Sequence, residues 1–289
     1  MTALFRRCRS RRSWRSSAGV TRLLPRNVSD RLPQVTSAQF GSASACSSCN
    51  RRVPSSAVHR AAATVLCGVA IALTGCGGSS GPPRFDAGHF HGAKIDNPWF
   101  PLRPGTTLVY RGTKDGKRAR DVVTVTAETK EILGVPCAVV HDRLFLAGEP
   151  AEETLDWYAQ DDDGDVWYFG EATRELENGR VTSTEGSWQA GVHGAEPGLV
   201  MEAKPTVGDS YEQEHFAGHA EDHARVLSLS ASVRVPHGSY TGAQLTREWT
   251  PLEPGVIDHK YYVRRVGLVK EQTAKGPLER LDLFKLTLS

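Results

Sequence analysis

The most distinctive group of residues that could do chemistry is a run of acids between two aromatic segments, DWYAQDDDGDVWYFGE, at 156–171. Carboxylates crowded on one turn repel each other, and a hard cation such as Ca²⁺ would relieve that repulsion. Asp161, Asp163 and Asp165 are the candidate metal ligands. An EF-hand loop starting at Asp161 would need glycine sixth and glutamate twelfth, but glycine comes fourth and alanine twelfth. An Asp-Gly pair between aromatic runs favours a β-hairpin instead, with weak calcium binding as the alternative.

Three histidines form the second candidate group. His215, His219 and His223 lie in HFAGHAEDH at i, i+4 and i+8, a spacing that on a helix would align them to bind zinc. Gly218 would interrupt that helix, and the H-E-x-x-H order of zinc proteases is absent. We therefore expect a hairpin that turns at Gly218, with the histidines opposite acidic side chains of the paired strand.

No residue set resembles a complete catalytic site. The sequence offers no nucleophile with an adjacent base and no glycine loop that would cradle a phosphate, so neither catalytic residues nor a cofactor are expected. Cys137 is the one cysteine that follows Cys76. Without a partner it cannot form an intramolecular disulfide, and its apolar neighbours predict a buried, unreactive thiol.

Cys76 itself lies in the context of a lipid-modification motif. The segment His59–Cys76 has a short basic start, an apolar run over Ala61–Leu73, and then Leu-Thr-Gly-Cys. The run is too short to cross a membrane but fits the apolar region of an export signal. The tetrad resembles the bacterial lipoprotein signal, in which the cysteine is acylated and becomes the first residue. We therefore expect a signal peptide at 59–75 and a membrane anchor at Cys76.

The charge of the chain changes at this cysteine. Of the 35 basic and 33 acidic residues, 12 Arg and the single acid Asp30 lie before it, which leaves the rest with a net charge of −9. An acidic exported part argues against nucleic acid as a partner. Residues 1–58 are rich in Arg and Ser without sustained periodicity, so we expect an unstructured extension, or one that is not translated if synthesis starts at Val53 or Val58. The Gly/Ser/Pro-rich start of 76–94 predicts a flexible tether.

Residues 95–289 read as a succession of strands. Alternating apolar and polar runs, separated by Gly, Pro or charged turns, recur about every ten residues, and no window carries a long amphipathic helix. We predict one mainly β domain, an antiparallel curved sheet that forms a half-barrel or barrel-like structure. The expected strands are at 106–112, 121–128, 135–148, 154–160, 165–171, 179–188, 209–218, 224–233, 239–249, 256–265, 267–274 and 279–289.

Several phrases resemble a family of uncharacterised bacterial secreted or lipid-anchored proteins. They are NPWFPLRPGTTLVY, DWYAQDDDGDVWYFGE, STEGSWQAGVHGAEPG, VGDSYEQE, EWTPLEPGVIDHKYYV and RVGLVKE, and together they span 97–271. More remotely, the closing strands resemble half-barrel envelope proteins, among them carriers of lipoproteins. The resemblance implies a cell-envelope location and brings no catalytic residue with it.

Two functions of different class follow from these observations. The preferred one is a non-enzymatic envelope lipoprotein with a structural or binding role, whose partner would be a lipid or another envelope protein. Trp157, Tyr158, Trp167 and Phe169 would line its apolar binding surface. The alternative is a calcium- or zinc-dependent binding protein or hydrolase that uses the acidic loop or the histidines.

Overall fold

The structure, a computed structural model, describes residues 84–288. Among these residues the chain forms antiparallel strands and one 3₁₀ turn, Ala87–His89. The strands are β1 (Thr107–Lys114), β2 (Lys117–Ile132), β3 (Val135–Leu146), β4 (Glu149–Gln160), β5 (Val166–Glu177), β6 (Arg180–Ser183), β7 (Trp188–Gln189), β8 (Gly198–Met201), β9 (Ser210–Glu212), β10 (His223–Val235), β11 (Gly238–Trp249), β12 (Ile257–Val263), β13 (Gly267–Lys275) and β14 (Arg280–Thr287).

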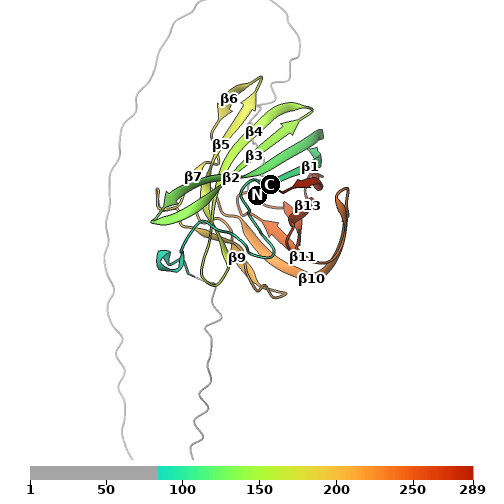
Figure 1. Ribbon diagram of the computed structural model, residues 1–289. Helices are drawn as coiled ribbons and strands as arrows, with labels where there is room; N and C mark the ends of the chain where they lie inside the picture. Colours follow the sequence, from blue (N-terminus) through green and yellow to red (C-terminus); the bar gives the residue numbers. More distant parts are fainter. Residues whose placement is uncertain (1–83, 289) are drawn as a thin grey trace, which may run out of the picture. The chain divides into compact units, whose positions relative to one another are not determined.

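All of the strands belong to one sheet, drawn as a curved wall in Figure 1. Its order is β6-β5-β4-β3-β2-β1-β14-β13-β12-β11-β10-β9, with β7 and β8 also paired to β5. Most neighbours in the sheet are neighbours in the sequence, as expected for a meander. Along the main order the exception is the pairing of β1 with β14, Thr107 with Thr287 through Thr113 with Arg280, which joins the two halves of the sheet.

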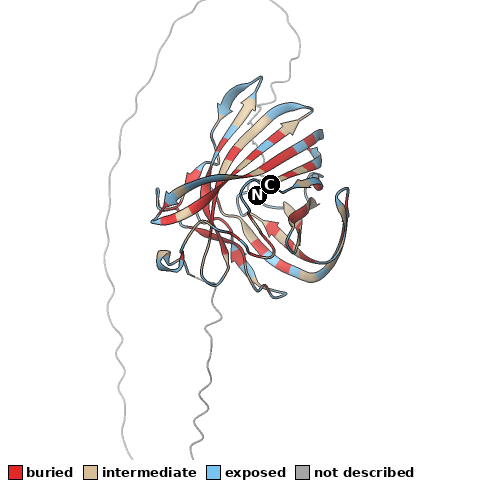
Figure 2. Cartoon of the chain, viewed as in Figure 1, coloured by how far each residue is buried: buried red, intermediate tan, exposed pale blue. Residues whose placement is uncertain are grey.

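The sheet curls until distant strands face each other. The ring of Phe100 lies 5.3 Å from that of Tyr158 on β4 and 6.4 Å from that of Tyr262 on β12, two strands separated in the sheet by five others. The hydroxyl of Tyr110 on β1 likewise reaches past β14 to donate to the carbonyl of Leu268 on β13, at 2.9 Å. We call the face that carries these side chains the inner face, and Figure 2 shows buried residues following the strands around it.

The two ends of the curled sheet approach each other without full pairing. The backbone N–H of Glu196, before β8, donates to the carbonyl of His215, after β9, at 2.9 Å. A Cβ added at Gly198 would lie 2.2 Å from the carbonyl oxygen of Gln213, so the two backbones pass very closely there. We call this line of approach the seam. The fold is an open, curved antiparallel sheet, which confirms the half-barrel prediction.

The segment before β1 packs against this sheet. Phe85 and Phe90 contact Trp167 and Phe169 on β5, with ring centroids 5.6 to 6.3 Å apart. The folded part therefore includes residues 84–94, which the sequence places in the tether. Their apolar side chains explain the difference, because burying two phenylalanines on an aromatic surface outweighs the cost of ordering a short segment.

The strand boundaries agree well with the sequence, with three differences. Of the run expected at 209–218, only β9, with three residues, is a strand. The run at 179–188 forms two short strands, and β8 lies in a stretch where no strand was expected. The extension 1–58, the signal peptide 59–75 and Cys76 lie outside the described residues. No helix in the described part of the chain is long and apolar enough to span a membrane.

Candidate functional site

The acidic run at 161–165 is the turn of the β4–β5 hairpin, as the Asp-Gly signal indicates. The carboxylate of Asp161 accepts hydrogen bonds from the backbone N–H of Asp165 and from the indole of Trp167, both at 2.8 Å. Asp165 accepts from the backbone N–H of Ala203 at 2.7 Å. Gly164 has φ 89°, a conformation in which glycine is favoured. These carboxylates therefore hold the turn and the neighbouring loop in place.

The same turn does not assemble a metal site. Within residues 84–288, no group of three or more His, Cys, Asp or Glu side chains is arranged to hold a metal ion. Asp163 is exposed, whereas the hydrogen bonds of Asp161 and Asp165 point to the hairpin and to residue 203. The three candidate ligands do not converge on one point.

Of the three histidines, His219 lies in a turn, His215 precedes the turn and His223 begins β10, so none of them is on a helix. A bridge between Phe216 and Ala220 closes a turn in which Gly218 has φ 75°, so the hairpin interpretation is confirmed. The ring of His219 stacks on Phe216, and that of His223 stacks on Trp249 at 5.4 Å. His215 lies 3.4 Å from Glu212 and 4.0 Å from Glu196. Each of the three imidazole rings thus contacts a different residue.

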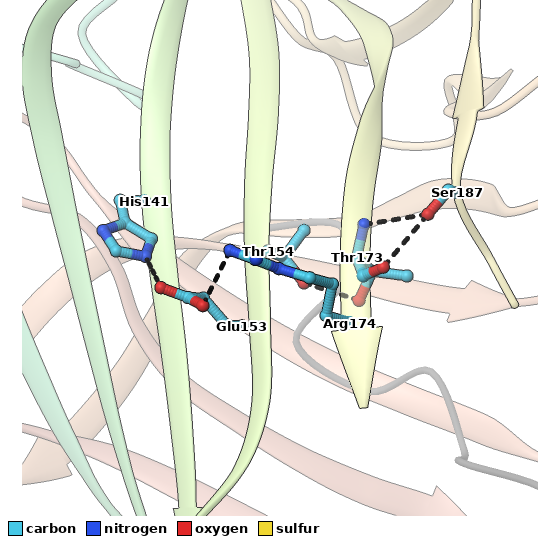
Figure 3. Close-up of polar contacts among 6 residues, drawn as sticks. All are labelled: His141, Glu153, Thr154, Thr173, Arg174 and Ser187. Atoms are coloured by element: carbon cyan, nitrogen blue, oxygen red, sulfur yellow. Dashed lines mark hydrogen bonds and ion pairs between the residues drawn. The ribbon is translucent and has the colours of Figure 1, made fainter. Parts of the chain in front are cut away.

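A histidine and a serine on the β3–β5 region raise the question of hydrolytic chemistry (Figure 3). Nε2 of His141 contacts Glu153 at 2.7 Å, and Glu153 also pairs with Arg174 at 2.9 Å. The hydroxyl of Ser187 instead accepts from the backbone N–H of Thr173 and donates to its carbonyl oxygen, at 3.0 and 3.1 Å. The hydroxyl and the imidazole serve different contacts, so they do not form a nucleophile–base pair.

Cys137 is completely buried and has no disulfide partner among the described residues. Burial raises the pKa of its thiol to about 12, which keeps it protonated at neutral pH. The prediction that this thiol is buried is confirmed.

The four aromatic side chains expected to line a ligand site are buried but do not gather on one face. Tyr158 lies on the inner face, stacked on Tyr168 at 4.8 Å. Trp157 lies on the opposite, outer face, where Lys130 sits 3.3 Å from its ring centroid. Trp167 and Phe169 are also on the outer face, against the N-terminal segment. Trp167 and Phe169 thus share contacts with Phe85 and Phe90, whereas Tyr158 lies on the opposite face of the sheet.

Trp167 borders a groove of about 760 Å³ that follows the outer side of the seam, here called the seam groove. Its apolar wall consists of Trp167 and Leu199, which are paired on β5 and β8, together with Phe85 and Pro197. Across the seam the lining comes from residues of β9, of the start of β10 and between them: Ser210, Tyr211, Glu212, His215 and His223. Arg84 and Glu196 add charged side chains on the same side as Trp167.

The inner face carries a second constellation, a row of buried carboxyl groups that we call the carboxyl belt. Direct strand pairing sets Asp156 opposite Glu171 and Tyr110 opposite Asp121. On the facing strands, Lys260 is paired with Glu271 and its Nζ lies 2.8 Å from the carboxylate of Glu248. The belt comprises Asp121, Asp142, Asp156, Glu171, Glu248 and Glu271, all of which are buried.

The carboxyl groups of the belt affect the pKa values of one another and of the tyrosines on the inner face. Burial, and then the negative charges of Asp121, Asp142 and Glu271, raise the pKa of Tyr110 well above its usual value. Burial is also the main reason that the pKa values of Asp121, Asp156 and Glu271 are raised. These carboxyl groups therefore hold protons more strongly than carboxyl groups in water do.

Tyrosine hydroxyls and one lysine satisfy part of the belt. The hydroxyl of Tyr168 donates to Asp156 at 2.6 Å and lies 3.0 Å from Glu171. Glu248 accepts from the hydroxyls of Thr246 and Tyr262, at 2.8 and 3.2 Å. Burial lowers the pKa of Lys260, but the charges of Glu248 and Glu271 outweigh that effect and raise it.

The sequence analysis missed the carboxyl belt, because acids that alternate with apolar residues normally mark the solvent face of a strand. A signal was nevertheless present. In VWYFGE, at 166–171, apolar side chains occupy both alternating positions, which indicates a strand buried on both faces. An acid that directly continues such a run, as Glu171 does, is expected to be buried as well.

Two solved structures are similar to the chain. One is "a putative exported protein with YmcC-like fold" from Bacteroides fragilis, 16% identical over 66% of this chain and 99% of that one, with a TM-score of 0.39. The other is "a putative lipoprotein" from Parabacteroides distasonis, 11% identical over 67% of this chain and 100% of that one, with a TM-score of 0.35. Neither a protein-family model nor a curated protein matches the chain. Similarity at these scores carries no argument about function.

Proposed function

We propose that the chain is an exported bacterial protein of the cell envelope, anchored to a membrane through acyl chains on Cys76, that binds the apolar part of a ligand in the seam groove without catalysing a reaction. The anchor is inferred from the apolar run and the Leu-Thr-Gly-Cys tetrad that ends at Cys76. The observation that carries the binding role is the groove itself, with Trp167 and Leu199 on one wall.

The dimensions and lining of the groove support this role. A volume of about 760 Å³ lies within the range of small-molecule sites, which are commonly apolar with a few polar groups for orientation. Phe85 and Leu199 extend the apolar wall, while Glu212 and His215 across the seam provide polar contacts. This division suits an amphiphile, such as a lipid, whose apolar part would lie against Trp167.

A binding experiment with a neutral apolar fluorophore, N-phenyl-1-naphthylamine, tests the proposal on the purified full chain. Ser210 is an exposed residue of the groove wall, so Ser210→Phe should fill the groove from its rim without disturbing the core. We expect at least a tenfold loss of affinity. Ser230→Phe, on the exposed part of β10, is the matched control and should bind like the native chain.

The outcomes separate clearly. Equal binding by Ser210→Phe and the native chain would place the probe elsewhere and remove the groove from the proposal. Failure of the native chain to bind the probe would reject an apolar ligand altogether. Far-ultraviolet circular dichroism of both variants checks that the sheet is retained.

A further inference from the structure

A row of basic side chains crosses the outer face of the sheet, on the side away from the carboxyl belt. Direct strand pairing links one residue on each of seven neighbouring strands, from β10 through β11, β12, β13, β14 and β1 to β2. In that order, the residues of this basic row are Arg225, Arg247, His259, Gln272, Arg280, Thr113 and Arg118. Four of them are arginines, one is a histidine and none is an acid.

The alternation of the strands places the basic row outside. Neighbouring residues of a strand point to opposite faces, and the residues of the row are next to buried residues of the inner face. Arg247, for example, directly precedes Glu248 of the carboxyl belt. Arg118, Arg225 and Arg280 are exposed. The row is therefore open to a partner from solution.

Acids of this protein leave most of the row's positive charge unbalanced. Arg225 and Arg247 lie directly opposite each other, and like charges in such positions destabilise a sheet. Burial lowers the pKa of His259, and the charge of Arg247 also lowers it. Within residues 84–288, Arg280 is the member of the row that pairs with a carboxylate, that of Asp282, at 2.6 Å. An excess of positive charge thus lies on an exported part whose net charge is −9.

Aromatic rings beside the row already carry guanidinium groups. The guanidinium carbon of Arg247 lies 4.7 Å from the ring centroid of Trp249. That of Arg111, beside the row on β1, lies 3.6 Å from the ring centroid of Phe284. Single-stranded nucleic acids bind by stacking their bases on open aromatic rings. A ring that is covered by a guanidinium is not open on that side, which argues against a nucleic acid as the partner.

The shape of the row distinguishes a flat partner from a linear one. Neighbouring strands lie about 4.8 Å apart, so the seven positions span about 29 Å along the sheet. The sheet curls in this direction until β4 and β12 face each other, with the ring of Phe100 in contact with both (Figure 1). The row therefore bends around the convex side, and its two ends cannot both lie against one flat membrane surface. A flexible chain of anionic groups can follow the row over its whole length.

We propose that the basic row binds a linear acidic polysaccharide, whose anionic groups pair with the arginines as the chain runs across the strands. The planar guanidinium groups of these arginines suit carboxylate and sulfate groups, to which they donate paired hydrogen bonds. The choice of a polysaccharide rests on the exported location in the proposed function. The row itself shares no residue with the seam groove, so the two sites are tested separately.

Fluorescence anisotropy of labelled heparin oligosaccharides with the purified full chain tests the proposal. We expect an affinity that rises with oligosaccharide length up to about 29 Å and falls as salt is added, and no binding of neutral dextran. Arg118→Gln should weaken heparin binding at least fivefold. Arg180→Gln is the matched control, since Arg180 is an exposed arginine on β6 that lies off the row, and it should bind like the native chain.

Arg225→Gln provides a second test that combines binding with stability. Because it removes one of two like charges that lie directly opposite each other, it should raise the stability of the free protein in urea while weakening heparin binding at least fivefold. Arg180→Gln should do neither.

The outcomes that overturn the proposal are specific. They are no heparin binding by the native chain, an affinity that does not depend on oligosaccharide length, and equal binding by Arg118→Gln and Arg180→Gln. Tighter binding of oligodeoxythymidylate, or of vesicles that contain phosphatidylglycerol, would replace the polysaccharide with a nucleic acid or a membrane. Any of these results would leave the binding of N-phenyl-1-naphthylamine in the seam groove intact, so a failure here is distinct from a failure of the proposed function.

Discussion

At the scale of single residues, acids in this protein serve two distinct purposes. In the β4–β5 turn, Asp161 and Asp165 accept backbone and indole hydrogen bonds, so their charge is balanced by nearby N–H groups. On the inner face, no backbone N–H or indole among residues 84–288 donates to Asp121, which lies beside a second acid, Asp142. A charged residue type alone therefore does not distinguish an acid that holds a turn from an acid buried beside other acids. The number of hydrogen-bond donors around it does.

The hairpin turn yields a prediction at this scale. Gly164 has φ 89°, and a Cβ there would lie 3.2 Å from that of Ala203. Gly164→Val should lower the free energy of unfolding by about 1 kcal/mol or more, whereas Asp163→Asn should change it little. Urea denaturation of both variants provides the measurement. A rise in melting temperature of several degrees with micromolar calcium, lost in Asp163→Asn, would show that the turn binds metal after all.

At the scale of elements, periodicity predicts the strands well because most of them present one apolar set to the interior. β2 and β3 illustrate this, and both appear where the alternation places them. β8 was missed because all four of its residues are buried and it shows no alternation. Residues 84–94 were assigned to the tether because the Gly/Ser/Pro-rich run at 77–83 precedes them, and the sequence alone does not show that Phe85 and Phe90 pack on Trp167 of the folded sheet.

The candidate site was less predictable than the strands, because it depends on contacts that exist only once the sheet has folded. The sequence identified Trp167 as a candidate. It could not show which of Trp157 and Tyr158 lies on the inner face, because residues on both faces of β4 are buried. The seam groove and the carboxyl belt depend on which strands face each other after the sheet curls. That information lies in the pairing of β1 with β14 and in the approach at the seam.

The seam gives a prediction at the element scale. Because a Cβ at Gly198 would lie 2.2 Å from the carbonyl oxygen of Gln213, Gly198→Ala should push β8 and β9 apart. We expect a loss of about 1–3 kcal/mol of stability and faster amide exchange at 210–212. Hydrogen exchange followed by mass spectrometry measures both the site and the extent. Gly88→Ala, at an exposed position, is the control, and an equal effect there would contradict the close approach.

At the scale of the whole molecule, the buried acids determine how stability depends on pH. Burial raises the pKa of Glu152 and of Glu202 to about 7, from 4.5 for an ordinary glutamate. Between these values the folded state retains protons that the unfolded state has released, so stability falls as the pH rises. We expect the free energy of unfolding to be larger near pH 5 than near pH 8.

Urea titrations across this pH range test the effect. Glu152→Gln should flatten the decline between pH 4.5 and 7, because a neutral amide replaces a group that is costly to ionise. Glu149→Gln, exposed on the same strand, should leave the slope unchanged. A native chain whose stability rises over this range would contradict the assignment of raised pKa values.

The membrane anchor is a second prediction for the whole molecule. Cys76→Ser removes the sulfur that would carry the diacylglyceryl group, so the variant should appear in the soluble fraction and lose labelling by a fatty-acid probe. Cys137→Ser is the matched control, since the thiol of Cys137 is buried and should not be modified. Labelling that persists in Cys76→Ser would disprove the anchor.

The pairing of β1 with β14 has a consequence for the order in which the protein is made and folded. Until residues 280–287 are available, β1 has one unpaired edge and the sheet consists of two separate halves. Contacts between strands so far apart in sequence form slowly, because a long loop must close first. A chain of this topology therefore cannot complete its sheet while residues 280–287 are still being synthesised.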